Sequence, residues 1–338
     1  MALLRNTTVL LNHHNYDGPF PWAVSSSSSS SSSSCFRVVC VNGSWRNTFP
    51  FPIFKSSTKR PPIPNVNSQK HQQPQQEEED EEYQVLTSIK SNYNDIMILD
   101  TAKSRVLLLD SSYNVHSILY KHQKWTNSYW DEFASLPPII PKGPIAILGL
   151  GGGTAAHLML DLWPELQLEG WEIDQILIDK AREHFALSDL EKHTNAGGIL
   201  TVHVGDAFSP SINVSGRYAG VIVDLFSNGE VLAQLQEVTT WSNLNNWLMP
   251  GGRIMVNCGG TSAPSENVLW MQNSTIKALS IAFPEQISWK KMGKENGANY
   301  LALTGPIPDL ESWSTMVPEP LSNSVRQWKS CEGELGLN

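Results

Sequence analysis

The sequence has few cysteines and no long hydrophobic run. Only four Cys occur in 338 residues, and they form neither a CxxC zinc pair nor the dense pattern of a disulfide-bonded secreted domain. No stretch approaches the roughly 18 consecutive apolar residues that a membrane-spanning helix needs. The sequence therefore favours a reducing compartment and excludes a membrane span. The histidines show no HExxH or paired-ligand spacing, so no metal site is expected.

Acidic residues are almost absent from the first 76 residues, which carry seven Lys or Arg and one Asp. Ten consecutive serines occupy 25–34, and no apolar stripe is long enough to pack. A basic, serine-rich, acid-poor N-terminus is typical of organelle transit peptides, and the serine run favours the plastid stroma (chloroplast) over the mitochondrion. The alternative is an ordinary disordered tail. We expect 1–76 to be this transit peptide and tail, and 77–83 to be an acidic linker.

The rest of the chain is strongly acidic, with 17 basic and 32 acidic residues and a net charge of −15 against −9 for the whole. Such a charge repels a phosphate backbone at long range, so general nucleic-acid binding is not expected. The 40% of hydrophobic residues are enough to build the core of one or two domains.

Short apolar runs separated by turn residues indicate a small N-terminal β-domain over 84–136. Its expected strands, 96–99, 106–109 and 115–119, form a β-meander. The aromatic-rich segment 121–136 is expected to be a helix that ends before the prolines at 137, 138 and 141.

From residue 137 to 310 strands and helices alternate, which predicts an α/β domain with a Rossmann-like, seven-stranded sheet. The expected strands are 145–148, 168–173, 200–204, 221–223, 253–257, 286–290 and 300–304. Helices are expected at 154–163, 175–185, 230–248 and 266–283, and 311–338 is expected to be a C-terminal tail.

A glycine-rich turn, 149–153, follows the first strand of this domain and precedes a helix. That arrangement presents free backbone N–H groups and lets a ligand approach the backbone closely. Glu172 ends the next strand nineteen residues after Gly153, close to the roughly 20 expected for an acid that binds ribose hydroxyls. Asp206 and Asp224 end two further strands, so these acids should gather at one sheet edge and form a nucleoside site.

Five segments carry a resemblance to a known family: GLGGGT (149–154), WEID (171–174), VGDA (204–207), VIVD (221–224) and LMPGG (248–252). In this order they resemble the spermidine-synthase-like branch of the class I S-adenosylmethionine-dependent methyltransferase superfamily, and the upstream meander resembles the small β-domain of that branch. The resemblance covers about 84–305 and implies S-adenosylmethionine, or its decarboxylated form, as cofactor. It also makes a homodimer plausible.

The resemblance implies roles for individual residues. Gly151 and Gly153 would line the amino-acid end of the cofactor, and Glu172 would hold the ribose hydroxyls. Asp206 with Ala207 would meet the adenine. The remaining predicted cofactor-binding residues are Gly149, Thr154, Asp174 and Asp224.

Departures from the family pattern bear on the reaction. Aminopropyltransferases of this family carry an acid in GGGDGG, where this chain has Thr154, and a second acid in a DSSD loop, where it has Ser227. A hydroxyl is a poor base for an ammonium group, whereas methyl transfer can proceed without a dedicated base. The sequence therefore favours a methyltransferase over an aminopropyltransferase, and a non-catalytic binding protein is the third alternative.

In this interpretation Asp224 and Asn228 are the catalytic candidates, since they would orient the acceptor. Tyr129 and Asp131 are the substrate-binding candidates, because the family has a tyrosine and a glutamate in that stretch. The acceptor itself, a small molecule or a protein side chain, is left open.

Overall fold

The computed structural model describes residues 82–111, 114–209, 216–260, 270–293 and 299–331, together with the backbone of two short strands. These two strands, β1 (Val39–Val41) and β2 (Ser44–Arg46), form an antiparallel pair within the segment for which we expected no fold. The rest of the expected transit peptide and the linker up to residue 81 lie outside the described residues.

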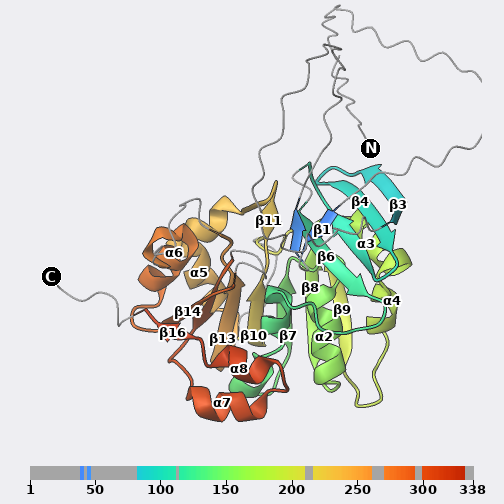
Figure 1. Ribbon diagram of the computed structural model, residues 1–338. Helices are drawn as coiled ribbons and strands as arrows, with labels where there is room; N and C mark the ends of the chain where they lie inside the picture. Colours follow the sequence, from blue (N-terminus) through green and yellow to red (C-terminus); the bar gives the residue numbers. More distant parts are fainter. Residues whose placement is uncertain are drawn as a thin grey trace, which may run out of the picture. The chain divides into compact units, whose positions relative to one another are not determined.

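The first large element after residue 81 is a four-stranded antiparallel sheet (Figure 1). Its strands, in spatial and chain order, are β3 (Tyr83–Lys90), β4 (Asp95–Thr101), β5 (Ser104–Leu108) and β6 (Val115–Tyr120). The last three are the meander predicted from sequence. β3 is an additional edge strand that the apolar pattern did not reveal, because only Thr87 among its residues is buried.

A mixed eight-stranded sheet forms the centre of the α/β domain, with the order β16-β14-β15-β13-β10-β7-β8-β9. The strands are β7 (Ile145–Leu148), β8 (Gln167–Glu172), β9 (Ile199–Val204), β10 (Tyr218–Val223), β13 (Leu248–Asn257), β14 (Ile287–Lys291), β15 (Tyr300–Thr304) and β16 (Lys329–Ser330). β7 to β10 and β13 run parallel, while β14, β15 and β16 pair antiparallel. Chain order reverses at β7, which lies between β10 and β8, and a sheet of this type binds ligands at such a switch point.

Helices pack on the sheet in two buried apolar clusters (Figure 1). One cluster contains residues of α2 (Thr154–Leu162), α3 (Gln175–His184), α7 (Leu310–Met316) and α8 (Leu321–Val325), and the other those of α5 (Val238–Asn245) and α6 (Ser274–Ala282). The remaining short elements are α1 (Tyr129–Phe133), α4 (Leu187–Leu190), the pair β11 (Phe226–Ser227) and β12 (Glu230–Val231), and 3-10 turns at Pro137–Ile139, Ala233–Gln236 and Trp270–Gln272.

The structure corrects three expectations. The helix expected over 121–136 is only α1, because Asn127 has a left-handed φ of 56° and Asp131 binds the backbone N–H of Asn127, which forms a turn. The helix expected over 230–248 divides into β12, a 3-10 turn and α5. The expected tail is folded as far as residue 331, since Trp313 and Trp328 are buried with ring centroids 6.1 Å apart and β16 adds the eighth strand.

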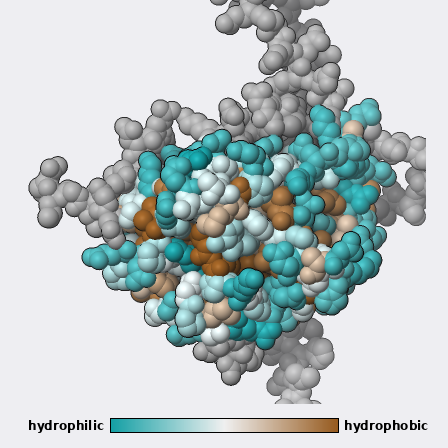
Figure 2. All heavy atoms as spheres, turned by 90° about the horizontal axis from the view of Figure 1, so that it is seen from below, coloured by the Kyte–Doolittle hydropathy of each residue, from teal (hydrophilic) through white to brown (hydrophobic). Residues whose placement is uncertain are grey.

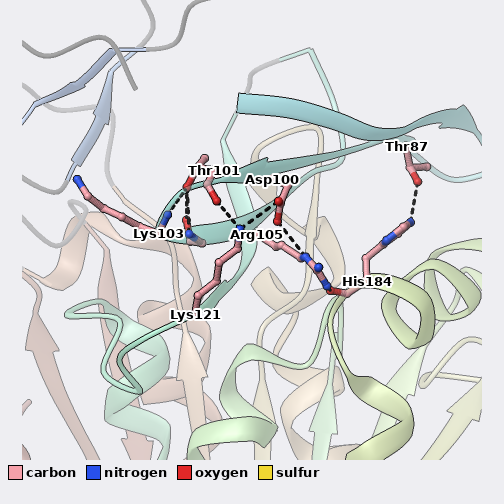
Figure 3. Close-up of polar contacts among 8 residues, drawn as sticks. Thr87, Asp100, Thr101, Lys103, Arg105, Lys121 and His184 are labelled. Carbon is pink, nitrogen blue, oxygen red and sulfur yellow. Dashed lines mark hydrogen bonds and ion pairs between the residues drawn. The ribbon is translucent and has the colours of Figure 1, made fainter. Parts of the chain in front are cut away.

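Polar contacts fix the four-stranded sheet against α3 (Figure 3). Arg105 Nη1 donates a hydrogen bond of 2.7 Å to the carbonyl of His184 at the end of α3, and Thr87 Oγ1 lies 3.1 Å from His184 Nε2. Asp100 accepts from Arg105 and from Lys121, each at 3.0 Å. Burial alone would raise the pKa of Asp100, but the two cations have the larger opposite effect. The pKa of Asp100 is therefore below its ordinary value. A separate contact joins β6 to the glycine turn of the larger sheet, since Gly152 N donates a 2.8 Å hydrogen bond to Ser117 Oγ.

The face of the molecule seen in Figure 2 is predominantly hydrophilic. Seen from below, apolar residues lie across the middle of the face and are surrounded by hydrophilic ones (Figure 2). Among the described helices none is long and apolar enough to cross a membrane.

Candidate functional site

The glycine turn after β7 lies against the end of β10. Gly149 has a φ of 88°, and a Cβ on it would lie 2.2 Å from the carbonyl oxygen of Asp224. Only glycine fits this conformation and this close approach without displacing the backbone. The turn is held to β8, since Gly149 N and Leu150 N each donate a 3.0 Å hydrogen bond to the carbonyl of Trp171.

Two predicted strand-end acids line a cavity of ≈ 240 Å³ in front of this turn. Glu172, which ends β8, accepts hydrogen bonds from Gly151 N at 3.1 Å and from Asp174 N at 3.2 Å. Burial raises the pKa of Glu172. Asp206 follows β9 and is exposed at the cavity, where its Oδ1 accepts a 2.9 Å bond from Phe208 N. Gly149, Gly151 and Ala207 line the same cavity.

Asp224, at the end of β10, forms a second group on the cavity wall. Its Oδ2 accepts a 3.2 Å hydrogen bond from the Tyr129 hydroxyl, and its Oδ1 accepts a 2.9 Å bond from Asn257 Nδ2. Burial raises the pKa of Asp224 to about 6, against the effect of these two donors. Burial and the neighbouring Asp224 raise the pKa of Tyr129 well above its ordinary value, so the phenol keeps its proton.

Five predicted site residues do not line this cavity: Gly153, Thr154, Asp174, Asp131 and Asn228. Thr154 Oγ1 accepts from Ile118 N at 2.9 Å and donates to Ile118 O at 3.0 Å, so its hydroxyl joins α2 to β6. Gly153, with a φ of 84°, is the N-cap of α2, and Asn228 is an exposed residue of the turn between β11 and β12 with a φ of 52°.

The two other carboxylates in that set have structural partners. Asp174 is buried, caps α3 through Ile176 N and Leu177 N, and accepts hydrogen bonds from Ser91 Oγ and Asn94 Nδ2 in the β3–β4 turn. Asp131 is buried as well and accepts three hydrogen bonds from Thr126 and Asn127. Burial raises its pKa to about 6.

Several cavity residues were not predicted, among them Tyr93, Asn94, Leu109, His116, Trp171 and Phe226. Asn257 was also missed, although it ends β13 and the rule that found Glu172, Asp206 and Asp224 could have found it. His116 lies on β6 of the other sheet, and no local pattern connects it to the glycine turn.

No model of a protein family matches the chain. The chain is 25% identical over 169 residues to a protein of Bifidobacterium longum (strain NCC 2705) named a probable polyamine aminopropyl transferase. That match covers 50% of this chain and only 36% of the relative's length.

Two solved structures extend the comparison. A probable spermidine synthase from Corynebacterium glutamicum ATCC 13032 matches with a TM-score of 0.50 and 17% identity, over 65% of this chain and 79% of that one. Human methyltransferase-like protein 13 in complex with SAH matches with a TM-score of 0.39 and 18% identity, over 58% of this chain and 86% of that one, which is too weak to support a conclusion. The fold of this chain, a mixed central sheet with an N-terminal four-stranded antiparallel sheet, is like that of the probable spermidine synthase.

Proposed function

We propose that this protein is a spermidine-synthase-like transferase that moves an aminopropyl group from decarboxylated S-adenosylmethionine to an amine. The observation that carries the proposal is the charge of the cavity. Three carboxylates line it (Glu172, Asp206 and Asp224), and no Lys or Arg is present among the described lining residues. Such a wall attracts cationic ligands, and both the sulfonium donor and an ammonium acceptor are cations.

The residues present fit the donor. Glu172 would accept hydrogen bonds from the ribose hydroxyls, and Asp206 with Ala207 would meet the adenine, as the resemblance implies. Gly149 and Gly151 line the cavity without a Cβ, which allows the donor to approach their backbone closely. When bound, the donor supplies a carbon activated by the sulfonium, and the protein supplies alignment and charge.

The same charge distinguishes the two forms of the donor. S-adenosylmethionine carries a carboxylate that its decarboxylated form lacks, and a cavity with three acids repels that carboxylate. The sequence alone favoured methyl transfer. The relative and the solved structure of the same fold are named for aminopropyl transfer and spermidine synthesis, which supports the aminopropyl reaction better.

Methyl transfer is the second candidate, and one observation favours it. Thr154 and Ser227 stand where the family's aminopropyltransferases have acids, and the Thr154 hydroxyl is fully occupied by the backbone of β6. Neither hydroxyl side chain supplies a negative charge that would attract a diamine.

Calorimetry with the purified chain and each form of the donor tests the proposal. We expect tighter binding of the decarboxylated form by about tenfold or more, roughly 1.4 kcal/mol. Mixing it with putrescine should then release methylthioadenosine over many turnovers. Tighter binding of S-adenosylmethionine, with no methylthioadenosine released, would favour methyl transfer instead. Binding without turnover of any acceptor would favour a non-catalytic protein.

A further inference from the structure

His116 lines the cavity in front of the glycine turn, but it belongs to the four-stranded sheet and not to the sheet that carries this turn. It lies on β6, and its Nε2 faces Asp110 Oδ2 at 3.4 Å. Both side chains are largely buried, with 15% and 12% of their surfaces exposed. A second cavity of ≈ 10 Å³, about the size of one water molecule, is lined by both His116 and Asp224. His116 and Asp224 therefore border the same small space.

An amine acceptor requires a group that removes a proton. The acceptor arrives as an ammonium ion, which has no lone pair for attack, and Ser227 stands where the family has an acid. The Tyr129 phenol keeps its proton, because burial and Asp224 raise its pKa well above the ordinary value. Asp224 has one oxygen bonded to Tyr129 and the other to Asn257.

We propose that His116, oriented by Asp110, is the base that takes the proton of the acceptor amine. This inference rests on the proposed function. In the tautomer that carries its proton on Nε2, the nitrogen 3.4 Å from Asp110 Oδ2, Nδ1 carries the lone pair. The ammonium gives one proton to Nδ1, and the freed lone pair of nitrogen forms the new C–N bond. The C–S bond of the donor breaks, and its electron pair stays on sulfur as a neutral thioether. The imidazolium later releases the proton to solvent.

The surroundings keep His116 neutral and ready to accept a proton. Burial lowers the pKa of His116, and this outweighs the opposing effect of Asp110. The other ionisable groups among the described residues of the cavity wall are Tyr129 and Asp224 near the glycine turn, Tyr93 in the β3–β4 turn, and Glu172 and Asp206 at the ends of β8 and β9. A neutral imidazole at neutral pH is the form that a general base needs.

The test compares His116→Gln with a closely matched control. His184 also has a carboxylate at 3.4 Å, that of Glu183, and 14% of its side chain is exposed, but it lies outside the cavity. We expect His116→Gln to lower kcat for methylthioadenosine release by about 100-fold or more. We expect donor affinity to stay within about threefold of the wild type, and His184→Gln to keep kcat within about twofold.

The pH dependence gives the decisive readout. Without the base only the free amine in solution can react, so the rate of His116→Gln should rise about tenfold per pH unit above neutral, while the wild type rises much less. If His116→Gln does not fold, Asp110→Asn carries the test, with an expected loss of about tenfold and the same steeper rise.

Two results would overturn the inference in different ways. Wild-type kcat in His116→Gln, or a loss that high pH does not restore, removes His116 as the base and leaves the proposed function standing. A wild-type protein that binds the donor but turns over no amine removes both.

Discussion

The two ends of the cavity are built differently. The end that we propose for the donor uses the glycine turn, Glu172 and Asp206, which come from three successive strands of one sheet and the turns that follow them. The end that we propose for the acceptor combines Tyr129, His116 and Asp224, with Asn257 behind Asp224. These residues come from a short helix, the other sheet and two strand ends. The donor end is therefore a local property of the chain, whereas the acceptor end depends on how separate elements dock.

A buried ion pair supports the acceptor end. Lys290 Nζ on β14 lies 2.8 Å from Glu132 Oε1 on α1, the helix that carries Tyr129, and only 3% and 5% of the two side chains are exposed. Ser324 of α8 also donates to Glu132, and its carbonyl accepts from Lys290 at 3.0 Å. The C-terminal segment thus holds the helix that supplies the acceptor end.

The largest effect is expected from Lys290→Met. This substitution leaves the Glu132 carboxylate buried without its cation, which should lower the free energy of unfolding by about 3–5 kcal/mol. Urea denaturation followed by tryptophan fluorescence measures it. The exposed Lys277 of α6 provides the control, and Lys277→Met should change stability by less than about 0.5 kcal/mol. Equal stabilities of the two variants would show that α1 does not depend on this pair.

Asp224→Asn should have the next largest effect, this time on the reaction. It removes the negative charge that faces the cationic reactants while keeping the size of the side chain, so kcat/KM should fall by about 100- to 1000-fold. Because the pKa of Asp224 is raised to about 6, the carboxylate form is lost as pH falls through 6, and wild-type activity should fall with it. Rates of methylthioadenosine release from pH 5 to 8 give both results. A decrease in kcat/KM of less than fivefold would show that the Asp224 carboxylate does not contribute to the reaction.

The same contrast explains what could be predicted from sequence. The seven expected strands and the strand-end acids follow from apolar runs and turn residues within short windows, and all seven strands are present. The docking of the four-stranded sheet on the glycine turn has no local signal, so His116 was missed. Asp174 and Thr154 have the residue types of a binding site, but contacts with Asn94 and Ile118, distant in sequence, occupy their side chains. Trp313 and Trp328 pack against each other only when the C-terminal segment folds back. Because this contact is not local in sequence, α7, α8 and β16 were not predicted.

Glu172→Gln tests the donor end alone. The amide oxygen can still accept the hydrogen bond from Gly151 N, but the amide nitrogen cannot accept the one from Asp174 N. The side chain also loses the charge that strengthens bonds to the ribose hydroxyls. We expect the Kd of the donor to rise by about 10- to 100-fold, and the KM of the amine to stay within about twofold. Calorimetry and steady-state kinetics measure the two quantities. A larger change in the amine KM than in the donor Kd would mean that the two ends of the cavity are not separable.

Asp174→Asn should have the smallest effect on donor binding. It tests whether Asp174 contacts the donor, as its place beside Glu172 predicts, or only stabilises the elements that surround the site. Its side chain is buried, and all its described partners are protein atoms in α3 and the β3–β4 turn. The asparagine oxygen can still cap α3, but its amide cannot accept from Asn94, so stability should fall by about 1–2 kcal/mol. Donor Kd should change less than threefold, since the turn with Tyr93 and Asn94 is loosened but no donor contact is lost. Asp179→Asn, on an exposed position of the same helix, controls for the lost charge. A tenfold rise in Kd at unchanged stability would instead place Asp174 at the donor and extend the donor end beyond the residues that line it now.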